Sequence, residues 1–362
     1  MSKRSPAQIL EEWLTVKAAA TDRHALIPLP TTRALGERFG LSHGTAFRVL
    51  CRLEERKQVW REANGRFYPA LARRVLGRPK PLAVVFRRMA AWSSLCREVM
   101  EGFTDECGQQ ERGVLLLFNK DLIVQPSPQS PPRVAPPRRQ RELLQEMLLL
   151  HGESLGGMLF DELWSEDALE KTLPAGANAV TFYRSGRPGG IGSIGADFRT
   201  GALMALSHLL ACGYEHIFLL NPFPHYEPSR LFLAAAQAVY REIAGTNLPE
   251  ERIIPLFEPA RRGAFLRKLA SRKSRCGLIC PEDNSSIFLA AELQARGIPL
   301  GTGHGLISVM GTSEALSAQI SAVRYDFRTM GKLAARALCE GRNEGTLLAP
   351  TLVPGRTTGP AA

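Results

Sequence analysis

Two groups of residues have types and spacings that could do chemistry. The first lies between residues 31 and 69, where cationic and hydroxyl side chains recur at short intervals. Arg donates hydrogen bonds to phosphates and to guanine, while Ser, Thr and His can reach phosphates or base edges. The chemistry of this group is therefore the binding of a polyanion, and of nucleic acid above all. Its members are Arg33, Ser42, His43, Thr45, Arg48, Arg52, Arg61, Gly65 and Arg66.

The second group follows apolar segments that read as strands. Glu282 and Asp283 follow CGLIC after one proline, Arg184 follows AVTFY, Arg230 begins the helix after HIFLL, and Trp92 lies in the loop after LAVVF. Open α/β sheets bind ligands at the carboxyl ends of their strands, and carboxylates with Arg suit a sugar or a small polar metabolite. Trp92 could stack on a sugar face. The alternatives are that Asp283 only caps the following helix and that Trp92 only packs.

Three helices and a hairpin must position the first group. Residues 6–20 place apolar side chains on one helical face, after a Ser-Pro start that is typical of a helix N-terminus. Residues 31–39 predict a second helix that Gly40 ends, and Ser42 caps a third helix running to about Arg56. The order is helix, tight turn, helix.

The third helix has one polar and one apolar face. Its polar face presents His43, Thr45, Arg48 and Arg52, whereas its leucines and Val49 face a small core. The segment VWREANGRFYP then alternates apolar and polar residues around Asn-Gly, which predicts a β-hairpin with Arg61 and Arg66 flanking its tip. A helix-turn-helix followed by a hairpin is a winged helix-turn-helix. The alternative is a small helical domain with a solvated basic face.

Charge and composition divide the chain. Residues 1–80 contain 16 Lys and Arg against 7 Asp and Glu, a net charge of +9 out of the chain's +11. We therefore expect a first domain over residues 1–69 and a basic, Pro-containing linker over residues 70–81. Residues 82–356 alternate strand and helix patterns, which predicts parallel sheets with helices on both faces. Residues 121–137 are Pro-rich and predict an extended loop.

Two short strings match enzyme motifs but lie in the wrong context. GIGSIG (190–195) has the glycine spacing of a dinucleotide fingerprint, yet IGSI itself reads as a strand, and the helix starts only near Thr200. GESLG (152–156) matches a nucleophile elbow, but it stands between a helix and a strand rather than between a strand and a helix. We therefore expect no enzyme and no cofactor.

Cysteines and histidines add no metal site. The seven cysteines form no CxxC pair, and the histidines lack ligand spacing, so we expect neither a disulfide framework nor a zinc site. The N-terminal segment has no apolar stretch of export-signal type, and no run approaches the roughly eighteen apolar residues of a membrane span. A cytoplasmic protein without a membrane partner is expected.

The first domain resembles a known family. The stretch LPTTRALGERFGLSHGTAFRVLCRLEERKQVWREANGRFYP resembles the winged-helix domain of the GntR family, whose pattern runs Leu-Pro-Ser-x-Arg-x-Leu-Ala and then Ser-Arg-x-Thr-Val-Arg. The resemblance implies phosphate or base contacts for Arg33, Thr45 and Arg48. His43 stands where that family usually has Arg.

The remainder resembles the effector core of the LacI family, a two-lobed fold of periplasmic-binding-protein type. The segments that carry this resemblance are IGSIGADFRTGALMALSHLLACGYEHIFLLNP, CGLICPEDNSSIFLAAELQARGIPL and ISAVRYDFRTMGKLAARAL. It implies effector contacts for Arg230 and for one of Glu282 and Asp283. The chain departs from the family where Gly-Thr-Ser-Glu (311–314) replaces Gly-x-Asp-Asp and where Tyr325 replaces Gln, a further candidate effector contact.

Together these observations predict a fold and a function. The fold is α/β, with an N-terminal winged helix-turn-helix and a two-lobed parallel-sheet domain. The function is a homodimeric repressor of transcription that binds double-stranded operator DNA and responds to a sugar-like effector between the lobes. The alternatives are a constitutive DNA binder with an unresponsive dimerisation domain, a solute-binding protein, or an α/β enzyme.

Overall fold

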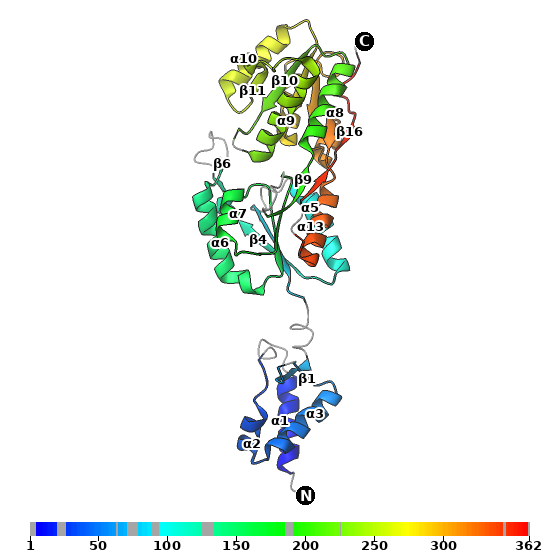
Figure 1. The fold of residues 1–362 in the computed structure, drawn as a ribbon. Coiled ribbons are helices and arrows are strands. Elements are labelled where there is room, and N and C mark those ends of the chain that lie inside the picture. Colours follow the sequence, from blue (N-terminus) through cyan, green and yellow to red (C-terminus); the bar gives the residue numbers. More distant parts are fainter. Residues whose placement is uncertain are drawn as a thin grey trace. The chain divides into compact units, whose positions relative to one another are not determined.

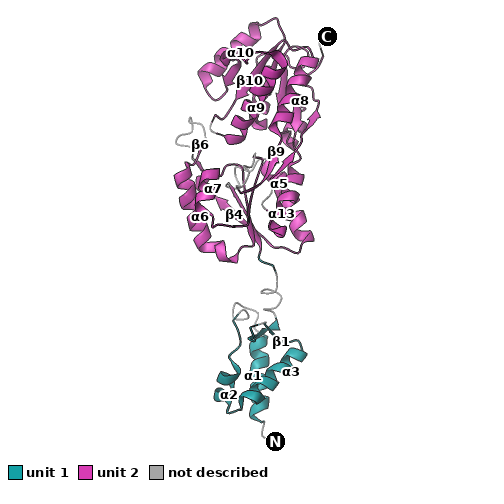
Figure 2. Ribbon diagram, viewed as in Figure 1, with its two compact units in different colours: residues 1–80 teal, residues 81–362 magenta. Residues whose placement is uncertain are grey.

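The computed structural model of the 362-residue chain divides into two compact units, residues 1–80 and residues 81–362 (Figure 2). Each unit has a hydrophobic core of its own. The residues that the structure describes are 5–19, 27–62, 64–70, 79–87, 94–124, 133–184, 191–224, 226–342 and 345–360.

Unit 1 begins with three capped helices. Side-chain oxygens of Ser5, Thr31 and Ser42 accept hydrogen bonds from backbone amides in the first turns, so each helix starts at the predicted position. Gly40 ends the second helix with a φ of 66°, a conformation that glycine adopts without steric cost. The helices are α1 (Pro6–Ala18), α2 (Thr32–Phe39) and α3 (His43–Glu55).

A β-hairpin completes unit 1. Strands β1 (Val59–Arg61) and β2 (Phe67–Pro69) pair antiparallel, and Gly65 has a φ of 85° in the turn between them. The hairpin packs Val59 and Phe67 into a core built mainly from leucines of the three helices. Three helices followed by a two-stranded hairpin form the predicted winged helix-turn-helix arrangement.

Unit 2 contains two six-stranded sheets, each at the centre of one lobe (Figure 1). The sheet of the first lobe has the order β15-β9-β8-β7-β3-β4 and is parallel throughout. The sheet of the second lobe has the order β11-β10-β12-β13-β14-β16, and only β16 runs antiparallel to its neighbour.

The first-lobe strands are β3 (Leu82–Arg87), β4 (Val114–Asn119), β7 (Gly157–Phe160), β8 (Ala179–Phe182), β9 (Gly192–Ala196) and β15 (Thr346–Leu348). The second-lobe strands are β10 (His216–Asn221), β11 (Ile253–Pro255), β12 (Cys276–Cys280), β13 (Gly305–Ser308), β14 (Ser321–Arg324) and β16 (Thr351–Val353).

Helices cover the sheets because the central strands are apolar on both faces. The helices of the first lobe are α5 (Ser94–Gln109), α6 (Pro137–His151), α7 (Glu166–Thr172) and α13 (Phe327–Glu340). Those of the second lobe are α8 (Phe198–Ala211), α9 (Glu227–Ala244), α10 (Pro259–Ser271), α11 (Asp283–Ala295) and α12 (Ser313–Ser317). Short 3-10 helices are η3 (Lys120–Leu122), η4 (Gly152–Ser154) and η5 (Glu250–Arg252). The two-lobed α/β architecture predicted from the sequence is confirmed.

Three segments of the described chain pass from one lobe to the other, at residues 196–198, 324–327 and 348–351. A single core cluster runs through this connection, because Tyr183, Phe198 and Tyr325 pack edge to face beneath it. The Tyr183 hydroxyl also donates to the carbonyl of Val309 in the other lobe, at 3.2 Å. The lobes therefore share buried contacts as well as chain connections.

Helices α5 and α13 lie in direct backbone contact. A Cβ atom at Gly102 would meet the Arg328 carbonyl oxygen at 1.9 Å, and one at Gly331 would meet the Val99 carbonyl oxygen at 2.0 Å. Only glycine fits at these positions. Beside them, Arg336 of α13 donates two hydrogen bonds, at 3.1 and 3.0 Å, to the buried carboxylate of Glu106 on α5.

This pair predicts an acid-dependent loss of stability. The hydrogen bonds from Arg336 lower the pKa of Glu106 below its ordinary value of 4.5 in the folded chain. Its contribution is thus complete above pH 4.5 and is lost as the pH falls through the lowered pKa. We expect Glu106→Gln to lower the thermal midpoint of unit 2 by roughly 2–4 °C at neutral pH. The gap to the unsubstituted protein should narrow as the pH falls below 4.5, which calorimetry over a pH series measures.

The matched control is Glu242→Gln. Glu242 pairs with Arg199 at 2.7 Å, but both side chains are more than half exposed, so this substitution should change the midpoint little. If the difference in midpoint between Glu106→Gln and the unsubstituted protein does not shrink as the medium is acidified until unfolding, the assignment is contradicted.

The Pro-rich segment differs from its expectation. Residues 121–137 were predicted to form an extended loop, yet η3 ends at Leu122 and a two-stranded antiparallel hairpin follows, with Ile123 opposite Val134. Its strands are β5 (Ile123–Val124) and β6 (Arg133–Val134), and α6 begins at Pro137. Proline restricts φ but leaves the carbonyl free to accept, so short strands can form at the ends of such a segment. The Pro-rich centre, 125–132, lies outside the described residues.

Candidate functional site

A row of polar side chains lies on the exposed face of α3. The Ser42 and Thr45 hydroxyls are 2.9 Å apart, and the Arg48 guanidinium donates to the Thr45 hydroxyl at 3.3 Å. Ser42, His43 and Arg48 are exposed, while Ala46, Val49 and Leu50 on the other face are fully buried. The helix therefore offers hydroxyl and guanidinium donors in a row, which is the chemistry for contacts with base edges and phosphates.

Arg52 is held differently from Arg48. Its guanidinium forms an ion pair with Glu11 of α1 at 2.9 Å, and Arg56 binds the other oxygen of the same carboxylate at 2.6 Å. Desolvation raises the pKa of Glu11, but the hydrogen bonds and charges of both arginines outweigh it, so the pKa is lowered. The structure thus places Arg52 on a contact that fastens α1 to α3.

The remaining basic candidates occupy the hairpin and α2. The Arg61 guanidinium lies over the rings of Phe47 and Phe67, at 5.3 and 5.6 Å from their centroids. Arg66 is exposed beside the turn, and its backbone amide donates to the Asn64 side chain. Arg33 is exposed in the first turn of α2, where the helix dipole favours an anion.

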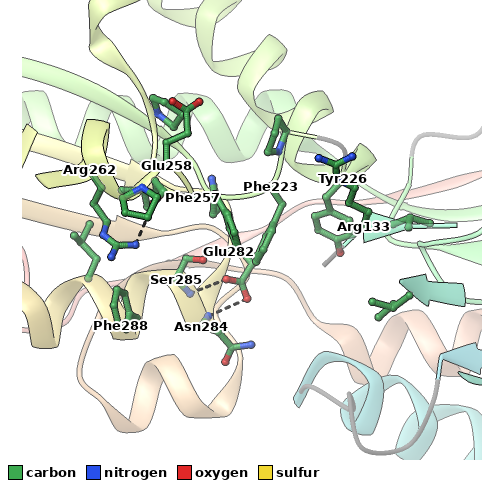
Figure 3. A pocket seen from close by; sticks show the side chains of 18 of the residues that line it. Arg133, Phe223, Tyr226, Phe257, Glu258, Arg262, Glu282, Asn284, Ser285 and Phe288 are labelled. Atoms are coloured by element: carbon green, nitrogen blue, oxygen red, sulfur yellow. Dashed lines mark hydrogen bonds between the residues drawn. The ribbon is translucent and has the colours of Figure 1, made fainter. Parts of the chain in front are cut away.

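A cavity of about 880 Å³ lies between the two lobes of unit 2 (Figure 3). The second lobe supplies most of its wall, from the loops after β10, β11 and β12 and from the start of α11. Its lining residues are Ile123, Arg133, Val134, Glu162, Leu163, Pro222, Phe223, Pro224, Tyr226, Pro255, Leu256, Phe257, Glu258, Pro259, Ala260, Arg262, Glu282, Asn284, Ser285, Phe288, Leu289 and Met310.

Aromatic rings form much of the second-lobe wall. The rings of Phe223 and Phe257 are in contact, with centroids 5.6 Å apart. Arg262 lies over the ring of Phe288 at 5.3 Å and also pairs with Glu292 at 3.4 Å. The prolines of the two loops hold these rings at the strand ends, since each proline fixes one backbone angle.

Glu282 is a carboxylate of the second-lobe wall, held at the start of α11. It caps α11, where one oxygen accepts from the Asn284 amide at 3.0 Å and the other from the Ser285 amide at 2.6 Å (Figure 3). Burial raises the pKa of its carboxyl, even though these hydrogen bonds favour the charged form. This carboxylate therefore faces the cavity with its position fixed by the backbone.

The first lobe closes the opposite side. Ile123, Arg133 and Val134 of the β5–β6 hairpin line the cavity, and Glu162 follows them from the loop after β7. The Tyr226 hydroxyl, from the second lobe, donates to Glu162 at 2.9 Å. A ligand in this cavity would thus touch both lobes at a place where they already contact each other.

Of the six sequence-predicted ligand residues, the structure places only Glu282 on the cavity wall among the described residues. Asp283 is buried behind it and accepts from the amide and the hydroxyl of Thr312, both at 2.6 Å, and from the Ser308 hydroxyl. It therefore holds a turn together, and Glu282 rather than Asp283 caps the helix.

The other four predicted residues lie elsewhere. Arg184 is buried and pairs with Glu227 of the second lobe at 2.5 Å, so it joins the lobes beside the cavity. Arg230 is exposed on α9 and does not line the cavity, and Tyr325 is fully buried with its hydroxyl on the Asp197 carbonyl. Trp92 lies outside the described residues.

Sequence reasoning missed the aromatic wall. Phe223 and Phe257 stand in the segments Pro-Phe-Pro and Leu-Phe-Glu-Pro, which directly follow β10 and β11. An aromatic residue next to proline at the carboxyl end of a strand was the sequence pattern that could have indicated these two lining residues. For Phe288, one helical turn into α11, and for the hairpin residues, only the folded chain reveals their place.

The two enzyme-like strings lie as expected. The strand β9 contains most of the first string, and η4 with its following loop contains the second, so neither forms a strand-to-helix turn. Within the described ranges, no group of three or more His, Cys, Asp or Glu side chains is arranged to hold a metal ion. None of the helices in the described part of the chain has the length and apolar character that crossing a bilayer requires.

Comparison with known proteins gives matches in structure. No protein-family model and no curated protein matches the chain. A LacI family transcriptional regulator from Mycobacterium smegmatis aligns with a TM-score of 0.61 and 18% identity, over 78% of this chain and 100% of that one.

Two further solved structures are similar. A LacI family transcriptional regulator from Enterococcus faecium with bound ribose has a TM-score of 0.59 and 17% identity, covering 78% of this chain and 100% of that one. The lac repressor dimer bound to operator and the anti-inducer ONPF has a TM-score of 0.62 and 15% identity, covering 80% and 97%. At these identities the likeness concerns the fold: the chain has the two-lobed α/β architecture of LacI-type regulators.

Proposed function

We propose that the protein is a transcriptional regulator that binds operator DNA through unit 1 and senses a small molecule through unit 2. The observation that carries the proposal is the capped helix α3, with exposed Ser42 and Arg48 joined through Thr45, in a unit of net charge +9 that also has a basic hairpin. A helix of this kind enters the major groove, and a hairpin of this kind reaches the adjacent backbone or minor groove.

We assign the domain boundaries of the chain according to this proposed role. Residues 1–69 form the DNA-binding domain, residues 70–81 the linker, and residues 82–356 the ligand-binding and dimerisation domain. The GntR-type pattern around α2 and α3 supports the first assignment, with His43 and Arg48 as specificity residues and Arg33 and the hairpin arginines as phosphate contacts. Repression is the expected outcome of binding at an operator.

Ligand sensing rests on the interlobe cavity. A ligand that contacts both Glu282 and the β5–β6 hairpin would have a different affinity for open and closed lobes. It can shift the DNA-binding equilibrium only by that difference in affinity. The similar regulators with bound ribose and bound anti-inducer support a small organic effector, with a sugar or related metabolite as the first class to consider.

A homodimer would match a pseudo-palindromic operator. The edge strand β4 of the first lobe carries Leu116 and Phe118, which are 37% and 39% exposed and lie on the same face. An apolar edge strand of this kind pairs readily with another chain, so we place the dimer contact there.

We expect Leu116→Glu to convert the dimer to monomer and to weaken operator binding, as sedimentation velocity and DNA titration measure. Leu149→Glu on α6 is the control, since Leu149 is 87% exposed and belongs to a helix rather than to the edge strand. If Leu149→Glu dissociates the dimer and Leu116→Glu does not, the contact lies at α6 instead.

The test of the proposed function is selection of duplexes from a random-sequence pool by the full-length protein at physiological salt. Enrichment of a motif with two-fold symmetry, bound much more tightly than a scrambled duplex, supports an operator-binding regulator. Binding without enrichment, which fades steeply with added salt, reflects phosphate attraction alone and would overturn the proposal.

A further inference from the structure

We infer that the interlobe cavity selects a ligand that carries a protonated amine on a ring-sized apolar body. The inference rests on the proposed function, because it specifies the effector of that same site. The relevant features are a carboxylate fixed at the wall, the lack of a matching cation beside it, and aromatic rings around it.

The carboxylate of Glu282 is held in place without a cationic partner. Its two oxygens accept from backbone amides of α11, and among the described residues it forms no ion pair with Lys or Arg. The carboxylate of Asp283 is buried directly behind it and is also bound only by hydroxyl and amide donors. The N-terminal dipole of α11 offsets part of this charge, equivalent to about half an elementary charge.

The arginines of the lining do not balance this charge. Arg262 is committed, because it pairs with Glu292, donates to the Leu256 carbonyl and lies over Phe288. Arg133 is exposed on the hairpin, on the opposite side of the cavity, next to Tyr226 in the view of Figure 3. Among the described residues, neither arginine of the lining therefore forms an ion pair with Glu282.

The rings suit a cation on an apolar body. Phe223, Phe257 and Phe288 line the same wall as Glu282, and their faces attract a cation as well as packing against an apolar ring. A volume of about 880 Å³ accommodates a molecule of one or two rings. A carboxylate with aromatic faces around it is how proteins recognise organic ammonium groups.

A neutral sugar would find fewer partners. Its hydroxyls need several donors and acceptors, whereas prolines, phenylalanines and aliphatic side chains make up most of the lining. The ammonium group can belong to an aromatic amine or to an aminated sugar, since both present a ring face and a cation. The experiment separates these two sources.

Two matched probe pairs test the inference, each differing in an ammonium group for a hydroxyl. The pairs are tryptamine with tryptophol and glucosamine with glucose, titrated into the full-length protein by isothermal calorimetry. We expect the amine of at least one pair to bind roughly tenfold or more tightly than its neutral partner, the usual advantage of a charged hydrogen bond. The pair that shows the preference identifies the source.

Substitutions assign the preference to the carboxylate. Glu282→Gln keeps an oxygen for the helix cap but removes the charge, and it should reduce the preference to about twofold or less. Glu282→Asp keeps both the charge and a favourable cap, so it should retain the preference. Glu251→Gln, at an exposed position in η5, is the control and should bind like the unsubstituted protein.

Three results would overturn the inference: neutral partners that bind as tightly as the amines, no binding of either amine, or a preference that survives Glu282→Gln. The operator titration keeps this outcome separate from the proposed function. If glucose binds and changes operator affinity, the proposed regulator function is supported and the amine preference is rejected. If an amine binds but operator affinity does not change, the amine site is supported and the sensing of an effector is rejected.

Discussion

Replacing Arg48 by Ala should lower the affinity for the selected operator roughly 5- to 150-fold, the range expected for a base contact worth 1–3 kcal/mol. Arg48 is exposed on α3, and its guanidinium is oriented by Thr45, which in turn contacts Ser42. The loss should be smaller on a scrambled duplex, because base contacts contribute to specific binding only. Fluorescence anisotropy on the two duplexes measures both values.

Arg52→Ala is the matched control for this prediction. Arg52 lies one helical turn further along the same helix, but its guanidinium is bound to Glu11. We therefore expect a smaller loss of operator affinity, together with a lower thermal midpoint of unit 1. Equal losses for the two variants on both duplexes would mean that α3 contributes charge alone, and the assignment of Arg48 to base recognition would be wrong.

Replacing Asp283 by Ala should destabilise unit 2 by several kcal/mol, because each buried donor that it leaves unsatisfied costs about 1–3 kcal/mol. The carboxylate accepts from the amide and hydroxyl of Thr312, from the Gly311 amide and from the Ser308 hydroxyl. Alanine would leave these buried donors unsatisfied between β13 and α12. Urea unfolding followed by hydrogen exchange in residues 276–320 measures the loss.

The control is Asp326→Ala in the same unit. Asp326 caps α13 through the amide and hydroxyl of Thr329 and is exposed, so its loss should cost about 1 kcal/mol. Similar values for the two variants would contradict the scaffold role of Asp283. A variant of normal stability that has lost its amine preference would instead make Asp283 a ligand contact.

Glu282 and Asp283 show where a local sequence pattern stops being sufficient to assign a role. Glu282 and Asp283 are neighbours in the sequence, and both follow an apolar strand, so the pattern treats them alike. In the fold one side chain faces the cavity and the other faces the turn before α12. The role of Asp283 is decided by residues 308–312, which bind its carboxylate. These residues lie further along the chain, after the helix that Glu282 caps and near the end of the next strand.

The sequence by itself determined the elements and the architecture. Helix caps at Ser5, Thr31 and Ser42, the glycine at residue 40 and the Asn-Gly turn act through bonds between near neighbours, so unit 1 follows from local patterns. The alternation of apolar strands with helices likewise predicted parallel sheets, because strands buried on both faces need helical cover.

Only the tertiary structure decided which side chains meet at the sites. Arg52 and Arg48 occupy equivalent positions on the polar face of one helix, but Arg52 binds Glu11, 41 positions away in the sequence. Arg184 has the position of a ligand residue at a strand end, yet it pairs with Glu227 across the lobes. The aromatic wall and the β5–β6 hairpin come together from four separate parts of the chain. Side-chain partners depend on how distant segments pack, whereas caps, turns and periodicity depend on neighbours in the sequence.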